Sequence, residues 1–232
     1  MIGWMSVPGR VDAAALLLSL EPPAWHLRHV RAVAEVAGWL ALRAAVAGHL
    51  VDRALVESAA LLHDVDKMLP AADVSRALPH GARGAAWLAA RGHGELAAAV
   101  ANHPVSRLGA PDADAWLDRA TVEELFVAYA DKRAGQRLVP MAARFAEWTR
   151  RYPEGAEWHG WTGDEAASVR RRAARLEAAA CAYAGVTPAA VRRLAWTGRA
   201  LAAARLRSRA RSLPAARSLT GARDVAAAGD DS

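Results

Sequence analysis

The stretch Leu61-Leu-His-Asp-Val-Asp-Lys67 places a histidine and an aspartate side by side at the end of an apolar segment. The residues before this stretch predict a helix that begins after the capping residue Asp52 and ends near Asp64. Leu55 is expected on its buried face. The carboxyl end of a helix carries partial negative charge and attracts a cation. Imidazole nitrogen and carboxylate oxygen together suit Mn, Fe, Co, Ni or Zn better than calcium. Taken alone, the pair has an alternative interpretation, a capping aspartate beside a surface histidine.

Two other segments carry metal-ligating residue types on predicted helices. His29 lies early in a helix predicted over residues 25–47, whose apolar residues recur at helical spacing. Asp131 lies late in a helix that the capping-box pattern Thr121-Val-Glu-Glu124 opens. The order is therefore His, then His-Asp, then Asp, each on a separate helix. Metal sites in helix bundles are built in this way, from side chains that project inward from facing helices.

The rest of the chain also predicts helices, with Pro- and Gly-containing breaks between them. Thr162-Gly-Asp-Glu165 is a second capping-box pattern, and Thr187-Pro188 predicts the cap and the first residue of the last helix. The further helices are predicted over residues 12–20, 81–91, 94–102, 140–151, 162–184 and 187–205. Hydrophobic residues make up 53% of the 232 residues, and many are Ala or Leu, which favour helix. We therefore expect an all-α fold.

Charge is distributed unevenly along the chain. Thirteen arginines and a single acid, Glu177, lie between Arg170 and Arg223, and three acids follow, Asp224, Asp230 and Asp231. Residues 1–169 therefore carry 17 basic and 20 acidic side chains. We expect a core over residues 1–152, a C-terminal helical extension over 153–205 and a disordered Arg-rich tail over 206–232. An Arg-rich segment can bind nucleic acid. A solvated segment is favoured here, because no aromatic residues interleave the arginines of the last stretch.

The single cysteine, Cys181, excludes an intrachain disulfide and a CxxC metal site. This usage fits a reducing cytoplasm. The longest apolar run near the start, residues 13–20, is far too short to span a membrane. We therefore expect a cytoplasmic protein that does not enter the membrane. The oligomeric state is left open.

Three segments, His29-Val-Arg-Ala-Val-Ala34, Leu61-Leu-His-Asp-Val-Asp-Lys67 and Tyr129-Ala-Asp-Lys132, together resemble the HD superfamily of metal-dependent phosphohydrolases. The resemblance covers residues 25–151 and implies an HD-domain helical bundle followed by the C-terminal helical extension. It implies metal ligands at His29, His63, Asp64 and Asp131.

Two further histidines extend the resemblance. In HD subfamilies with two metals, histidines at the places of His80 and His103 bind the second ion, and the shared aspartate bridges the two ions. The pattern looks most like the bacterial symmetrical dinucleoside-tetraphosphatase subfamily, which carries an arginine where Arg137 stands. Both histidines have alternative roles, in binding substrate phosphate or in ending a helix. The implied cofactor is one or two divalent ions: Mn, Fe, Co, Ni, Zn or Mg.

Some residues depart from the patterns of HD subfamilies. Asp66 stands where HD proteins often have Gly or Ala, and it either orients a ligand histidine or is an exposed acid. Pro104, and not a second histidine, follows His103, which speaks against the cyclic-dinucleotide phosphodiesterases. The acidic pair of guanosine-tetraphosphate hydrolases is missing. His26 lies on the same helix face as His29, and we interpret it as a surface residue or a support for a ligand.

This residue set predicts hydrolysis of a phosphate ester or phosphoanhydride in a nucleotide or another small phosphorylated substrate. Metal coordination lowers the pKa of a bound water from about 16 toward about 7, which makes metal-bound hydroxide available to attack phosphorus. Asp64, Lys67 and Arg137 are the expected catalytic residues, with Lys67 and Arg137 contacting phosphoryl oxygens. Two alternatives stay open: a non-catalytic HD domain that senses a nucleotide or metal, and a nucleic-acid-binding protein that acts through its Arg-rich C-terminal part.

Overall fold

Helices form the regular structure of the chain in the computed structural model, which describes residues 7–70, 73, 77–152 and 161–212. The α-helices are α1 (Arg10–Leu18), α2 (Ala24–Val46), α3 (Arg53–Leu62), α4 (Ala82–Ala89), α5 (Ala97–Ala101), α6 (Ala113–Arg119), α7 (Val122–Arg133), α8 (Met141–Arg151), α9 (Gly163–Ala184) and α10 (Thr197–Ser212). Short 3₁₀ turns are η1 (Val65–Met68), η3 (Gly94–Leu96), η4 (Val105–Gly109) and η5 (Pro188–Ala190). No strand forms within these ranges, where Ala134 and Leu138 make an isolated bridge. The predicted all-α fold is confirmed.

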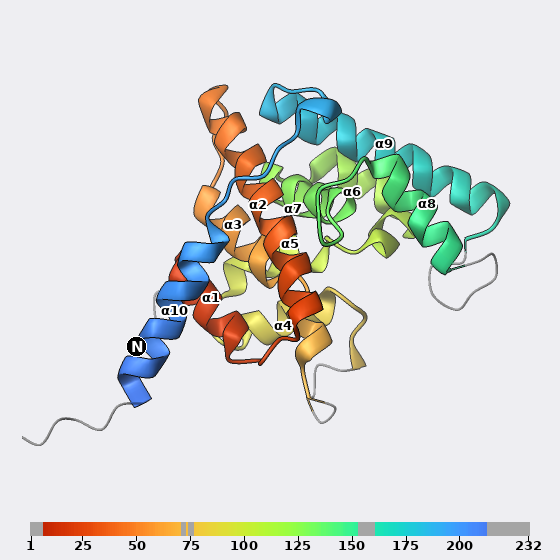
Figure 1. The fold of residues 1–232 in the computed structure, drawn as a ribbon. Helices are drawn as coiled ribbons and strands as arrows, with labels where there is room; N and C mark the ends of the chain where they lie inside the picture. Colours follow the sequence, from red (N-terminus) through yellow and green to blue (C-terminus); the bar gives the residue numbers. More distant parts are fainter. Residues whose placement is uncertain (1–6, 71–72, 74–76, 153–160, 213–232) are drawn as a thin grey trace, which may run out of the picture.

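Helix α2 runs through the middle of the bundle and packs against α3, α7 and α9 (Figure 1). Its buried side chains include Val30, Val33, Ala37 and Leu40, which recur every three or four residues as predicted. Many of the buried positions hold alanine, whose small side chain allows neighbouring helices to approach closely. Gly48 follows the end of the helix with a φ of 87°, a conformation that glycine adopts at little cost.

Side-chain caps determine where the two other helices of the predicted site begin. The Asp52 carboxylate accepts a hydrogen bond from the Leu55 backbone N–H over 2.9 Å at the start of α3. At the start of α7, Thr121 accepts from the Glu124 N–H and Glu124 accepts from the Thr121 N–H, over 3.3 and 3.0 Å. Both caps were predicted and are confirmed. Each satisfies backbone donors that the first helical turn leaves unpaired.

The start of the last helix differs from the prediction. Thr187-Pro188 opens only the 3₁₀ turn η5, and α10 begins at Thr197. The residues between them are held by α2 instead: the Leu194 N–H donates to the Glu35 carbonyl over 2.9 Å, and the buried Trp196 indole donates to the Ala34 carbonyl over 3.3 Å. These tertiary contacts outweigh the local helix signal.

Three smaller differences concern element boundaries. Thr162 precedes α9 but makes no capping hydrogen bond with its side chain, so the second predicted capping box is wrong; Gly163 has a φ of 39° at that point. Helix α6 lies in a stretch for which no helix was predicted. The predicted disordered tail is helical up to Ser212, and the rest of it lies outside the described residues.

The C-terminal helices pack directly onto the preceding part of the chain. Helix α9 contacts α2 and α7, and α10 lies beside α1 (Figure 1). Tyr129 of α7 donates its hydroxyl to Glu177 of α9 over 2.7 Å, and Cys181 of α9 is buried beside the same hydroxyl. The predicted extension over residues 153–205 is therefore packed against the core in its described part. Within the described ranges, the helices lack the length and apolar character that crossing a bilayer requires.

Candidate metal centre

The six predicted metal ligands lie together, although they come from five different segments. Two overlapping groups form, and within each group the potential ligand atoms lie within 4.8 Å of one another. The first group is His29, His63 and Asp64, and the second is Asp64, His80 and His103. Asp131 stands beside the first group. Asp64 therefore belongs to both groups.

The first group joins α2, the end of α3 and α7. The His29 Nε2 atom lies 3.2 Å from the His63 Nε2 atom, 3.3 Å from Asp64 Oδ2 and 3.4 Å from Asp131 Oδ1. His63 Nε2 lies 3.5 Å from Asp64 Oδ2 and 3.7 Å from Asp131 Oδ1. Two imidazole nitrogens and two carboxylate oxygens thus converge on one point inside the bundle.

The second group lies on the other side of the Asp64 carboxylate. His80 precedes α4, and His103 follows α5. Their Nε2 atoms are 3.2 Å apart and lie 3.3 and 3.4 Å from Asp64 Oδ1. The two oxygens of the Asp64 carboxylate therefore face different groups: Oδ2 faces the first group, and Oδ1 faces the second.

Each of the four histidines forms a hydrogen bond through Nδ1 to an oxygen outside the cluster, which directs its Nε2 atom into the cluster. His63 and His103 sit at the ends of α3 and α5, and each donates through Nδ1 to the carbonyl three residues earlier, Ala60 over 2.8 Å and Val100 over 2.6 Å. His29 Nδ1 donates to the Gly135 carbonyl over 2.8 Å. With Nδ1–H donating outward, the Nε2 lone pair of the neutral ring points into the cluster, as metal ligation requires.

Asp66 orients the fourth histidine. Its Oδ2 atom accepts hydrogen bonds from His80 Nδ1 over 2.8 Å and from the Gly81 N–H over 3.1 Å, and the residue is buried. Of the two interpretations that the sequence left open, the structure therefore shows the one in which Asp66 orients a ligand histidine.

The charges of the cluster are strongly coupled. Burial alone would raise the pKa of Asp64, but the nearby His63 and Lys67 outweigh it and hold that pKa well below its usual range. For Asp131, hydrogen bonds from His29 and His63 overcome the same effect of burial, so its pKa is also low. Both carboxylates are therefore ionised at neutral pH and offer full negative charge to a cation.

His29 and His80 each face two carboxylates, whereas His103 faces one. Burial lowers the pKa of His29 and of His80, but their contacts with two aspartates each outweigh it and raise the values to about 10 and about 9. Burial lowers the pKa of His103 to about 4, with the neighbouring His63 and His80 adding to the effect. Within the second group, a proton on His80 therefore faces an unprotonated His103 ring.

Lys132 is a site residue whose role the sequence analysis missed. Its side chain is fully buried, and its ammonium donates to the His103 carbonyl over 2.5 Å and to the Ala128 carbonyl over 3.1 Å, with Asp131 Oδ2 at 3.6 Å. Burial lowers its pKa, against the pull of Asp131. Lys132 thereby ties the segment of His103 to α7. The available signal was the position of Lys132 next to Asp131, in a helix whose preceding residues, 125–130, are all apolar.

The two predicted phosphate-binding residues are placed differently. The Lys67 ammonium lies 2.7 Å from Asp64 Oδ2, and 43% of its side chain is exposed, so it connects the cluster with solvent. Arg137 is exposed in the turn after α7, two residues beyond Gly135, and among the described contacts none joins its side chain to the cluster. The structure thus brings Lys67 to the cluster and leaves Arg137 outside it.

His26 is not a surface residue, and it makes no hydrogen bond to a predicted metal ligand. It is fully buried one turn before His29, and neither ring nitrogen has a hydrogen-bond partner among the described residues. Burial lowers its pKa to about 4, so the ring is neutral. Its ring meets that of Trp25 edge-on, with the centroids 5.4 Å apart.

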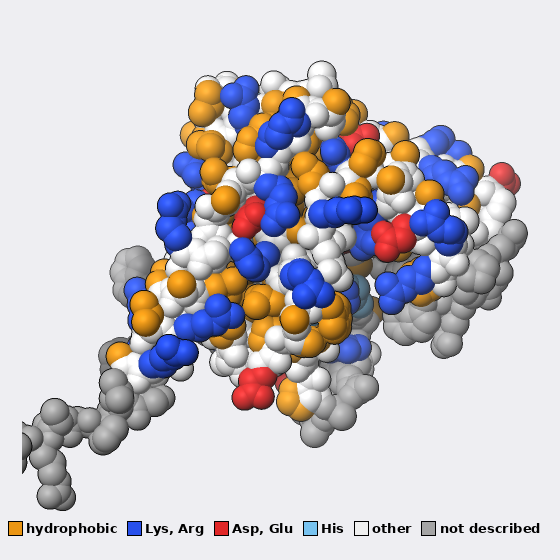
Figure 2. Space-filling view, viewed as in Figure 1, with side chains coloured by type: hydrophobic (Ala, Val, Ile, Leu, Met, Phe, Trp, Pro, Cys, Tyr) orange, Lys and Arg blue, Asp and Glu red, His pale blue; other side chains and the backbone are white. Residues whose placement is uncertain are grey.

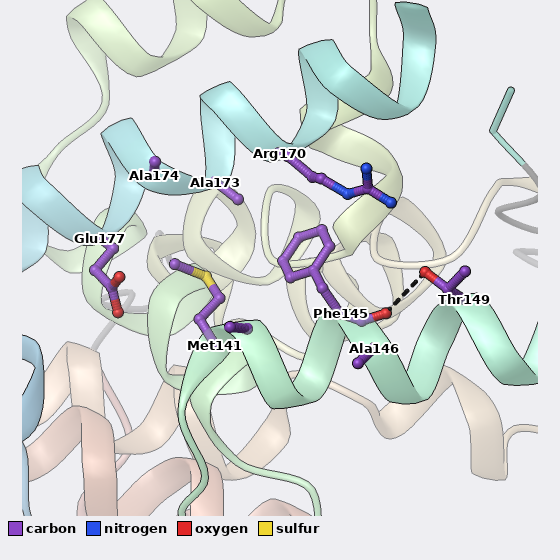
Figure 3. Close-up of a pocket in the computed structure, with 9 residues that line it drawn as sticks. Met141, Phe145, Ala146, Thr149, Arg170, Ala173, Ala174 and Glu177 are labelled. Atoms are coloured by element: carbon purple, nitrogen blue, oxygen red, sulfur yellow. Dashed lines mark hydrogen bonds between the residues drawn. The ribbon is translucent and has the colours of Figure 1, made fainter. Parts of the chain in front are cut away.

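An apolar cavity of about 420 Å³ lies elsewhere, between α8 and α9 (Figure 3). Met141 and Phe145 enter it from α8, and Arg170 and Glu177 border it from α9. Thr149 uses its hydroxyl to donate to the Phe145 carbonyl on its own helix. None of the clustered histidines or aspartates lines this cavity. It is therefore separate from the candidate metal centre.

Comparison with known proteins agrees with the geometry. Residues 27–135 match the family model of the HD domain, and that range contains all six clustered residues. The all-α bundle is consistent with an HD-domain bundle, and the match supports the HD superfamily, whose members bind divalent metals and are in general hydrolases. No curated protein and no solved structure gives a match.

Gly81 packs closely against the residues on either side of His103, and this packing can be tested by substitution. Its φ is 84°, and a Cβ atom there would lie 2.7 Å from Pro104 Cγ and 2.8 Å from the Ala101 carbonyl oxygen. We expect Gly81→Ala to destabilise the fold by about 1–3 kcal/mol more than Gly92→Ala. Gly92 is a matched control, because it has a φ of 83° and open space around its Cβ position.

The measurement is urea unfolding of both variants and the unaltered protein. Equal losses in the free energy of unfolding would mean that only the positive φ matters and that the contact with Pro104 is loose.

Proposed function

We propose that this HD-domain protein is a phosphohydrolase with two divalent metal ions, held by His29, His63, Asp64 and Asp131 on one side and by Asp64, His80 and His103 on the other. The observation that carries the proposal is the Asp64 carboxylate, whose two oxygens face two separate pairs of imidazole nitrogens. An ion pair with a purely structural role would need imidazoles at only one of the two oxygens.

The donor set fits divalent ions of the transition series. It consists of four inward-facing imidazole nitrogens and two ionised carboxylates. His29 and His80, whose pKa values are raised, would release a proton from the inward nitrogen when a cation binds. The buried Asp64 Oδ1 atom accepts no hydrogen bond from the described residues. A buried, ionised oxygen of this kind is costly unless a cation or a donor compensates it. Nitrogen and oxygen ligands without thiolate favour Mn, Fe, Co, Ni or Zn.

Two ions at such a centre would lower the pKa of water toward neutrality and neutralise charge on phosphoryl oxygens. The protein's own residues do the rest. Lys67 keeps Asp64 ionised and extends toward solvent, where its ammonium can meet a phosphoryl oxygen of the substrate. Arg28 donates to Gln136, so it lies against the turn that holds Gly135 and Arg137. Lys67 at the cluster, with Arg28 and Arg137 at the turn after α7, are thus three cations that suit an anionic substrate.

A nucleotide phosphoanhydride is the substrate that we propose. The order of motifs is similar to that of symmetrical dinucleoside tetraphosphatases, and Arg137 occupies the place of that subfamily's arginine. The exposed position of Arg137 leaves it free to contact a phosphate at some distance from the cluster. Its part in catalysis stays a prediction.

The experiment is metal analysis of the purified protein together with a hydrolysis screen. The screen covers a phosphomonoester, a phosphodiester, a nucleoside triphosphate and a dinucleoside tetraphosphate, each with Mn or Fe. We expect bound metal and turnover of at least one substrate. His63→Ala and Asp64→Ala should lose metal retention and reduce turnover to below about 1% while helical content persists. His49→Ala, an exposed histidine away from the cluster, is the control.

Metal retention without turnover of any substrate would favour the alternative, a domain that senses a nucleotide or a metal. Full turnover in the Asp64→Ala variant would contradict the proposal outright.

A substitution at Asp66 distinguishes two ions from one. Asp66 contacts only the second group, through His80, and together with Asp64 it raises the pKa of that ring against the effect of burial. We expect Asp66→Asn to weaken binding of one ion by about 10- to 100-fold and to leave the other unchanged. Calorimetric titration with Mn measures both affinities. Asp118→Asn, which alters an exposed acid on α6, is the control.

An Asp66→Asn variant with a single, unaltered binding event would indicate one ion, held by the first group. Equal weakening of two events would show that the groups do not act separately.

A further inference from the structure

Helix α10 has an anchored first half and a second half that projects from the bundle. Its buried side chains Ala200, Leu201 and Ala204 lie in the first half, the part that packs against α1. From Arg205 to Arg211 every residue is exposed. The far end of α10 extends beyond α1 and away from the other helices (Figure 1).

Four arginines occupy alternate positions of the projecting half. In an α-helix, residues four apart share a face and residues two apart point to nearly opposite sides. Arg205 and Arg209 therefore form a pair on one side, and Arg207 and Arg211 form a pair on the other. The positive charge is thus distributed over two opposite faces and not gathered in one stripe.

Little negative charge balances these arginines. Asp12 of α1 lies 3.0 Å from Arg207, and both side chains are more than half exposed, so solvent weakens the pair. Among the described residues no other ion pair is formed by the four arginines. In the space-filling view, Lys and Arg side chains spread over the region of α10 and α2, while acidic side chains are sparse there (Figure 2).

We propose that the projecting half of α10 binds double-helical DNA by entering its major groove. The groove is about 12 Å wide, admits an α-helix and has a phosphate backbone on each wall. Two opposed arginine pairs match two walls of phosphates. The groove of duplex RNA is deep and narrow, so the B-form duplex fits better.

The distribution of side chains disfavours a membrane as the partner. A helix that lies on a bilayer needs an apolar face opposite its basic face. In the exposed part of α10, Leu206 and Ala210 are the only apolar residues, and they lie between the two arginine faces. An acidic protein surface would likewise meet one face and leave the opposite pair of arginines unused.

The surface does not depend on the metal centre. Its residues are absent from both metal-binding groups, and α10 contacts α1 and α2 at positions away from the clustered histidines. DNA binding by α10 is therefore independent of the proposed hydrolase activity, and each can fail without the other.

The test is the binding of the full-length protein to a labelled 20-base-pair DNA duplex, measured by fluorescence anisotropy at several salt concentrations. The variants are Arg205→Gln/Arg209→Gln, Arg207→Gln/Arg211→Gln and the combination of all four. Glutamine keeps a helix propensity close to that of arginine. The control is Arg170→Gln/Arg171→Gln, which removes the same charge from the exposed surface of α9.

Log affinity falls as log salt concentration rises, and substitution of either α10 pair should make that slope less steep by about 2. The variant with all four substitutions should bind every DNA sequence at least about tenfold more weakly. The control should lower the slope less, and hydrolysis by all variants should equal that of the unaltered protein.

Three results would overturn the proposal. The first is the absence of binding to duplex DNA at about 50 mM salt. The second is an affinity that falls when one arginine pair is substituted but not when the other is. The third is an equal fall in affinity for the α9 control. Binding to vesicles of anionic lipid that depends on α10, without binding to DNA, would assign the surface to a membrane and refute the choice of partner.

Discussion

A buried carboxylate approached from both sides is the constraint on which this structure depends. Only 1% of the Asp64 side chain is exposed, and its two oxygens face different pairs of imidazoles. An uncompensated charge at such a position would cost several kcal/mol. Compensation has to come from several directions, because one helix face cannot surround a carboxylate. The convergence of α2, α3, α7 and the segments before α4 and after α5 follows from that requirement.

Helix ends supply much of the precision of the centre. The last carbonyls of a helix lack partners within the helix. In both α3 and α5, a histidine just past the end donates its outer N–H to the carbonyl three residues back, which satisfies that carbonyl and aims the inner nitrogen at Asp64. The same device thus serves both groups. Lys132 adds a buried cation that binds the His103 carbonyl and so links the second group to α7.

Local signals in the sequence predicted the helices that carry the centre, through their caps and apolar spacing, and the HD motifs predicted which six side chains would meet. Contacts between distant segments were beyond such signals. The partner of Lys132 lies 29 residues away, and the delayed start of α10 depends on the hold of α2 on Leu194 and Trp196. The Arg-rich end of α10 was predicted to be disordered from its composition, although arginine is itself a good helix former.

The most direct test of the account is a crystal structure of the protein grown with Mn²⁺, with the metal located by anomalous scattering. We expect two peaks about 3.5–4 Å apart on opposite sides of the Asp64 carboxylate. Each should be coordinated by the Nε2 atoms of one histidine pair. Anomalous density that avoids Asp64, or a metal-free cluster at saturating Mn²⁺, would contradict it.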